Sequence, residues 1–153
     1  MCFSPKLTDA GHYSFVTAGK NFETQARGPE FWNLDPYQGL FTHVKGETRF
    51  VQRVITCARW TPDGSLLLCG TTSGDVLTFL NRRLQQLIPT TNAAVTHVVG
   101  PLPNGVYVAS GGDGSLVPFS PDVSLPYARG DYRTPGVPDE LRLTPAAELM
   151  YVA

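Results

Sequence analysis

Apolar residues occur along the chain in short runs that are separated by turn-forming residues. Tyr13–Ala18 (YSFVTA) alternates apolar and polar positions, as a strand with one buried face does. Ser65–Cys69 is almost continuously apolar, which is typical of a strand buried on both faces. The pattern predicts short β-strands, with others at Met1–Pro5, Glu30–Leu34, Leu40–Val44, Val76–Leu80, Val95–Val99, Val106–Ser110 and Leu116–Phe119.

Two segments of the chain follow one plan. Val54–Asn81 predicts a strand, a Thr-Pro-Asp-Gly turn, a strand, a Gly-rich turn and a third strand. Val95–Ser120 repeats this order about 41 residues later. The alignment pairs Pro62 with Pro103, Gly64 with Gly105 and Gly70 with Gly111.

A period of about 40–45 residues with three or four short strands is the signature of β-propeller blades. We divide the chain into a blade at 1–36 with a loop inserted at Asn21–Pro29, blades at 37–81 and 82–120, and a Pro-rich loop with the start of another blade at 121–153. All belong to one propeller domain. Because propellers have about four to eight blades, these three to four predict an incomplete ring whose two ends look cut within strands.

Asn81–Pro89 allows two interpretations. Leu84, Leu87 and Ile88 have helical spacing, but the segment is short and ends at a proline. The repeat period leaves room for an outer strand here, so we favour a strand.

Composition excludes several classes of function. The formal net charge is −1, which supports no role in binding nucleic acid. No apolar run approaches the roughly 20 residues that span a bilayer, so a membrane partner is not expected. Cys2, Cys57 and Cys69 form no CxxC pair, and the three histidines lack ligand spacing. We therefore expect reduced cysteines, no metal and no cofactor.

Three stretches invite a chemical interpretation, and none supports it. Gly111–Gly114 leads into a strand and holds one acid, so it is expected to be a turn and not a phosphate or Ca²⁺ loop. Arg129–Asp131 is an integrin-type tripeptide attributed to chance. Ser73, Asp75 and His97 lack a GxSxG elbow, and His97 falls in a different blade from Ser73 and Asp75. The prediction is a non-enzymatic protein without a small-molecule substrate.

Several motifs resemble known repeats. Phe15–Leu34 (FVTAG…FWNL) and Thr61–Phe79 (TPDGSLLLCGTTSGDVLTF) look like WD40 repeats. With the QGLF linker in Tyr37–Phe41 and VASGGDGSLVPFS at Val108–Ser120, their order is similar to the echinoderm microtubule-associated-protein-like family over about two thirds of the chain. The turn at Cys69–Asp75 (CGTTSGD) also resembles ciliary and flagellar WD40 proteins of doublet microtubules.

The chain departs from the usual repeat in its Trp-Asp pair. That position holds Trp32-Asn33, and elsewhere Thr78-Phe79 and Pro118-Phe119. The resemblance implies a microtubule-associated scaffold of the cytoplasm and cytoskeleton, in the axoneme of a cilium or flagellum, with tubulin or other axonemal proteins as partners. The alternative is a generic WD40 protein–protein adaptor in another complex.

Basic residues gather along the sequence around the central repeat. They are a candidate contact for an acidic surface such as that of tubulin, and the alternative is a solvated outer edge. The candidate partner-binding residues are Lys45, Arg49, Arg53, Arg82 and Arg83.

Overall fold

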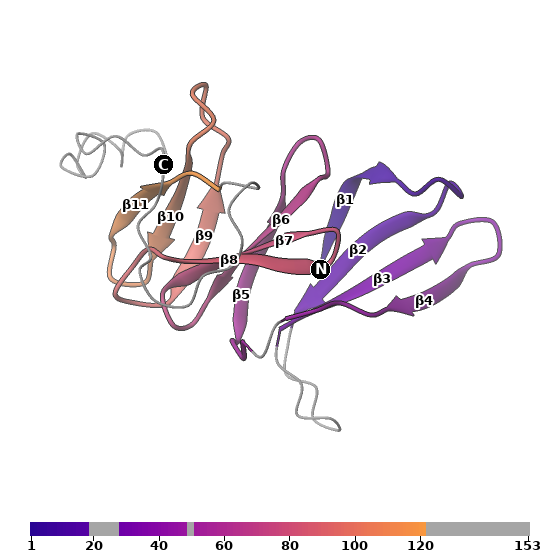
Figure 1. Ribbon diagram of the computed structural model, residues 1–153, viewed down its shortest axis with the longest axis horizontal. Helices are drawn as coiled ribbons and strands as arrows, with labels where there is room; N and C mark the ends of the chain where they lie inside the picture. The colour runs from indigo at the N-terminus through magenta and orange to yellow at the C-terminus, as the bar shows by residue number, and fades with distance from the viewer. Residues whose placement is uncertain (19–27, 49–50, 122–153) are drawn as a thin grey trace.

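The computed structural model describes residues 1–18, 28–48 and 51–121. Within these ranges the chain forms eleven strands in three antiparallel sheets, which stand side by side in sequence order (Figure 1). The all-β fold predicted from the short apolar runs is confirmed. The strands are β1 (Cys2–Leu7), β2 (Tyr13–Ala18), β3 (Pro29–Asp35), β4 (Leu40–Val44), β5 (Ile55–Trp60), β6 (Leu66–Thr71), β7 (Asp75–Leu80), β8 (Arg83–Pro89), β9 (Val95–Val99), β10 (Tyr107–Gly111) and β11 (Leu116–Phe119).

Each sheet is a meander in which consecutive strands are neighbours. The first sheet has the order β1-β2-β3-β4, the second β5-β6-β7-β8, and the third β9-β10-β11. Successive side chains of a strand point to opposite faces, so the register decides which residues share a face. In the first sheet Val16 is opposite Phe31, and Phe15 is opposite Trp32. These two pairs therefore lie on opposite faces.

The second sheet is the most buried because it has a neighbour on each side. All six residues of β6 are buried, as its continuous apolar run predicted. β7 is buried from Asp75 to Phe79. The segment with the ambiguous helical spacing is β8, a strand paired with β7. Here the pairing partner, and not the local spacing of Leu84, Leu87 and Ile88, decides the conformation.

The first strands of the sheets lie together on one side. The indole Nε1 of Trp60 in β5 donates to the Cys2 carbonyl oxygen of β1 at 3.3 Å. β5 is also linked to the third sheet. Arg59 Nε donates to the Gly100 carbonyl oxygen at 2.9 Å, and the Thr56 hydroxyl of β5 donates to the Val95 carbonyl of β9. β1, β5 and β9 are therefore the inner strands, and β4 and β8 are the outer strands of their sheets.

Two apolar cores fill the spaces between the sheets. Val16 and Phe31 of the first sheet pack against a row of the second sheet that consists of Ile55, Leu67, Cys69, Leu77, Phe79, Leu84 and Leu87. The opposite face of the second sheet packs against the third through Leu68, Val76, Ile88, Val95, Val98, Tyr107, Ala109 and Phe119. Trp60 is half-buried and packs against the first core.

The predicted repeat is confirmed at the first turn. The Gly64 N–H donates to the Thr61 carbonyl at 2.8 Å, and the Gly105 N–H donates to the Leu102 carbonyl at 2.8 Å. Both glycines have positive φ, +71° and +80°. They are 41 residues apart, as the sequence alignment proposed.

The pairing of Gly70 with Gly111 is wrong. At the second turn the Gly74 N–H donates to the Thr71 carbonyl, and the Gly114 N–H donates to the Gly111 carbonyl. Gly111 therefore corresponds to Thr71, at a spacing of 40 residues. Turns can gain or lose a residue without disturbing strand pairing, which explains the change of spacing within one repeat.

The first and second sheets end later in the chain than the blades predicted at 1–36 and 37–81. β4 pairs with β3 and closes the first sheet, although the boundary after residue 36 assigned it to the second blade. β8 likewise pairs with β7 across the boundary after residue 81. Both outer strands follow tight hairpin turns, which hold them against the preceding strand. Most of the Asn21–Pro29 loop, Arg129–Asp131 and the fourth unit after residue 121 lie outside the described residues.

Candidate protein-binding surface

Three of the predicted basic residues meet around one shallow pocket. Lys45 follows β4, Arg82 lies in the β7–β8 turn, and Arg83 begins β8. The pocket has a volume of about 460 Å³ and is lined by these three residues together with Gly46, Glu47 and Asn81. We call Lys45, Arg82 and Arg83 the basic surface. Arg49 lies outside the described residues.

The segment after β4 crosses to the outer edge of the second sheet, and this crossing builds the basic surface. The Glu47 N–H donates to the Arg82 carbonyl at 2.8 Å, and the Leu84 N–H donates to the Glu47 carbonyl at 2.8 Å. Gly46 makes the crossing possible, because a Cβ there would lie 2.6 Å from the Phe31 ring. Lys45 is thus held beside the β7–β8 turn by main-chain hydrogen bonds.

The β7–β8 turn holds Arg82 in an unusual backbone conformation. Leu80 pairs with Arg83, so Asn81 and Arg82 form a two-residue turn. Their φ angles are +50° and +66°. A glycine is strongly preferred at the second position of such a turn, and an L side chain in the left-handed region costs roughly 1–2 kcal/mol. Arg82 thus places a long cationic side chain at a position where the turn favours glycine, which has no side chain.

The basic surface is only partly neutralised. Arg83 Nε lies 3.4 Å from Glu47 Oε2, and the two side chains are 69% and 54% exposed. Such an exposed pair contributes little to stability. Lys45 and Arg82 form no ion pair with any described residue. Three cations therefore face one anion, which leaves an excess of positive charge.

Arg53 does not belong to this surface. Its Nε donates to Asp75 Oδ2 at 3.0 Å, and Asp75 is only 5% exposed. The other carboxylate oxygen of Asp75 accepts from the Thr71 hydroxyl. Asp75 and Leu80 lie at opposite ends of β7, which separates Arg53 from the β7–β8 turn by about 15–20 Å. The Arg53 guanidinium fixes the β6–β7 turn.

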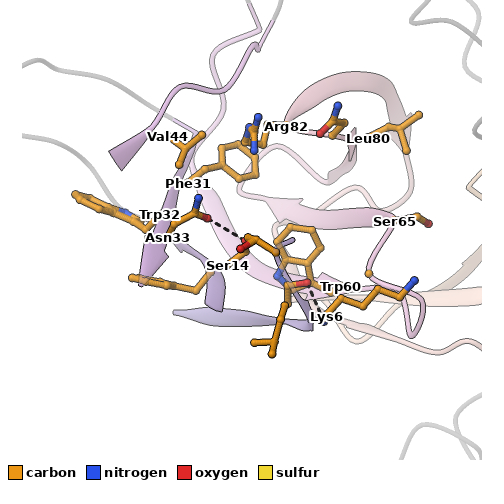
Figure 2. A pocket seen from close by; sticks show the side chains of 16 residues that line it. Lys6, Ser14, Phe31, Trp32, Asn33, Val44, Trp60, Ser65, Leu80 and Arg82 are labelled. Atoms are coloured by element: carbon orange, nitrogen blue, oxygen red, sulfur yellow. Dashed lines mark hydrogen bonds between the residues drawn. The ribbon is translucent and has the colours of Figure 1, made fainter. Parts of the chain in front are cut away.

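A cleft between the first and second sheets adjoins the basic surface and shares Arg82 with it. Side chains of both sheets line it, with a volume of about 350 Å³ (Figure 2). Its two charged lining residues are both cations, Lys6 and Arg82. Sequence reasoning missed Lys6, because Lys6 and Arg82 are far apart in the chain and only the packing of β1 beside the second sheet brings them to one cleft.

In the two turns described next, the aspartate side chains accept hydrogen bonds from residues of the same turn. Asp113 Oδ1 accepts from the Ser115 hydroxyl at 2.6 Å and from its N–H at 3.0 Å, which lowers the pKa of the carboxyl. Asp63 does the same in the first turn of the second sheet, where hydrogen bonds from Thr61 and then Ser65 lower its pKa to about 2. Carboxylates bound in this way stabilise the turns.

Asp75 and His97 are not arranged as a hydrolase site would require. Both carboxylate oxygens of Asp75 are engaged by Arg53 and Thr71. His97 is exposed on β9, opposite Ser110. Among the described residues, no three His, Cys, Asp or Glu side chains are grouped as a metal site would require. The described part of the chain also holds no helix of the length and apolarity needed to cross a membrane.

Comparisons with known proteins bear on the fold. No protein-family model and no curated protein match the chain. Among solved structures the chain is similar to the C-terminal WD40 domain of Sif2, with a TM-score of 0.55 and 10% identity, over 78% of this chain and 32% of that chain. At this identity the similarity shows the fold alone. The three described sheets are WD40-type β-propeller blades that do not close a ring.

Proposed function

We propose that the protein is a non-enzymatic, microtubule-associated scaffold that binds tubulin or another axonemal protein through the basic surface. A WD40-type fold supports a role in protein–protein interaction generally. The finer proposal rests on the sequence resemblance to microtubule-associated and ciliary WD40 proteins. Its setting is the cytoskeleton of the cytoplasm, in the axoneme of a cilium or flagellum.

The observation that carries the proposal is the excess positive charge at the outer edge of the second sheet. The chain as a whole has a formal net charge of −1, yet Lys45 and Arg82 have no anionic partner among the described residues. Complementary charge steers association and selects the partner. An acidic protein surface is therefore the partner that this edge fits.

Co-sedimentation with microtubules tests the proposal. Arg82→Gln removes one positive charge from the basic surface, and we expect it to weaken binding about two- to fivefold, which corresponds to the ~0.5–1 kcal/mol of an exposed ion pair. Gln38→Glu is the matched control, because it changes the net charge equally but lies in the exposed β3–β4 turn, at the far end of β4 from Lys45. The control should bind like the wild type.

Glu47 supplies a test of the opposite sign. Glu47→Gln keeps the main-chain hydrogen bonds of the crossing segment and releases Arg83 from its ion pair. We expect tighter binding to microtubules, and binding of every variant should weaken as salt rises. If the folded chain does not sediment with microtubules at low salt, the tubulin proposal fails and the generic adaptor remains.

A further inference from the structure

The cleft between the first and second sheets lies at the end of the second sheet that carries the β5–β6 and β7–β8 turns. Gly64 and Ser65 of the first turn line it, as do Asn81 and Arg82 of the second turn. Lys6 of β1 lines it from the first sheet. Its volume of about 350 Å³ is within the range of ligand sites, roughly 300–1,000 Å³.

The cleft has a positive charge that the described residues do not neutralise. Lys6 and Arg82 are exposed, and neither forms an ion pair with a described residue. At longer range Lys6 attracts the carboxylate of Asp63, but hydrogen bonds from Thr61 and Ser65 already hold that carboxylate within its own turn. The cleft therefore favours a ligand that carries negative charge.

The two cations stand at different ends of the cleft. Lys6 lies against the β5–β6 turn, where a Cβ on Gly64 would be 3.3 Å from the Lys6 Cβ and Cγ. Arg82 lies in the β7–β8 turn, two strand spacings or about 10 Å away, and the place of Lys6 on the neighbouring sheet adds to this distance. The rings of Phe31 and Trp60 lie between the two cationic side chains in the view of Figure 2. Two acidic groups, one for each cation, fit this arrangement better than one.

The surface between the two cations is aromatic. Phe31 and Trp60 both line the cleft, and Trp60 is half-buried there. The indole N–H of Trp60 already donates to the Cys2 carbonyl, so an apolar side chain can cover the ring without leaving this donor unpaired. Ser14 and Asn33, joined by a hydrogen bond of 3.0 Å, add polar groups that can bind a peptide main chain.

We propose that the cleft binds an extended acidic peptide segment of a partner protein, with an apolar side chain between two carboxylates. Residues i and i+4 of an extended chain are about 13 Å apart, and alternate residues point to the same side. Acidic residues at i and i+4 can then reach Lys6 and Arg82, while the residue at i+2 covers Phe31 and Trp60. The expected motif is acidic-x-apolar-x-acidic. This site goes beyond the proposed function, because it does not require the partner to be tubulin.

Fluorescence anisotropy with two labelled peptides tests the motif on the intact chain. The first peptide contains Glu-Ser-Leu-Ser-Glu. The matched control contains Glu-Leu-Ser-Ser-Glu, which has the same composition and charge but turns the leucine to the other side of an extended chain. We expect the first peptide to bind about tenfold more tightly, because only its leucine is buried against the aromatic surface.

A pair of variants tests the role of Lys6 in this binding. Lys6→Gln removes one positive charge from the cleft and keeps the Cβ and Cγ that pack on Gly64. It should weaken binding of the first peptide about two- to fivefold. Gln38→Glu is the control, because it changes the net charge equally but lies in the exposed β3–β4 turn, outside the cleft. It should bind the peptide like the wild type.

Equal binding of the two peptides would overturn the proposal, because charge alone would then account for binding. Absence of binding to the folded chain, or equal losses in Lys6→Gln and Gln38→Glu, would overturn it as well. These outcomes are separate from those of the proposed function. A chain that sediments with microtubules but binds neither peptide refutes only the cleft proposal, and a chain that binds the first peptide without sedimenting refutes only the tubulin proposal.

Discussion

The second turns of the two complete repeats provide a pair of glycines that separates backbone strain from packing. Gly74 and Gly114 have nearly the same φ, +85° and +84°. A Cβ on Gly114 would meet nothing within 4 Å. On Gly74 it would lie 2.1 Å from the Thr91 carbonyl oxygen and 2.8 Å from that of Ala93. Alanine is therefore strained at both positions but clashes at only one.

The free energies follow from this geometry. Either substitution costs roughly 1–2 kcal/mol for an L residue in the left-handed region. Gly74→Ala must in addition displace main chain, and overpacking costs typically ~1–3 kcal/mol more. The Gly74 carbonyl also accepts from the Thr90 N–H at 3.0 Å and the Thr91 N–H at 2.9 Å, so movement of the turn strains the link to the third sheet.

Urea denaturation followed by circular dichroism measures both variants. We expect the free energy of unfolding to fall by about 1–2 kcal/mol for Gly114→Ala and by about 2–5 kcal/mol for Gly74→Ala. The difference between the variants is the informative quantity, because the shared backbone term cancels. Equal losses would refute the reasoning, since they would mean that the segment between the second and third sheets does not restrain the turn.

Three further outcomes follow from buried groups of the second sheet. Thr78→Val should raise the free energy of unfolding by about 1 kcal/mol, because its buried hydroxyl lacks a hydrogen-bond partner; a loss in urea denaturation would contradict this. Arg53→Leu should lower the thermal midpoint more than Asp75→Asn, because it leaves a buried carboxylate without its cation; the reverse order would count against that role. Burial raises the pKa of the Cys57 and Cys69 thiols, so at pH 8 a smaller fraction is thiolate in the folded chain than in the unfolded chain. Both thiols should therefore react with a thiol reagent more slowly in the folded chain than after unfolding. Equal reaction rates would contradict this role of burial.

Strand positions could be predicted because each apolar run has a clear period and ends at turn residues. Tyr13–Ala18, Leu40–Val44 and Val95–Val99 agree with the observed strands at both ends. The blade boundaries could not be predicted, because the sequence does not show which neighbour an outer strand joins. The β3–β4 hairpin, closed by the Gly39 N–H donating to the Asp35 carbonyl at 2.8 Å, makes that choice.

The basic surface could be predicted only in part. Arg82 and Arg83 are adjacent in sequence, and Lys45 joins them because Gly46 allows the chain to pass close to Phe31. Nearness in sequence wrongly grouped Arg53 with these residues. Arg53 pairs with Asp75 at one end of β7, and the basic surface lies at the other end of that strand. The cleft between the first and second sheets also escaped prediction, because residues of both sheets line it and only the packing of the sheets brings them together.

The crossing segment at Glu47 also limits how the protein can aggregate. β8 is the outer edge of the second sheet, and a free edge is a template for strand addition. Glu47 occupies the start of that edge through its bridge to Arg83, and Pro89 at the other end has no N–H to donate. β4 is an exposed edge without a proline. Of these two edges, β4 is therefore the one at which edge-to-edge association between copies is expected. A charged residue introduced in β4 should suppress that association.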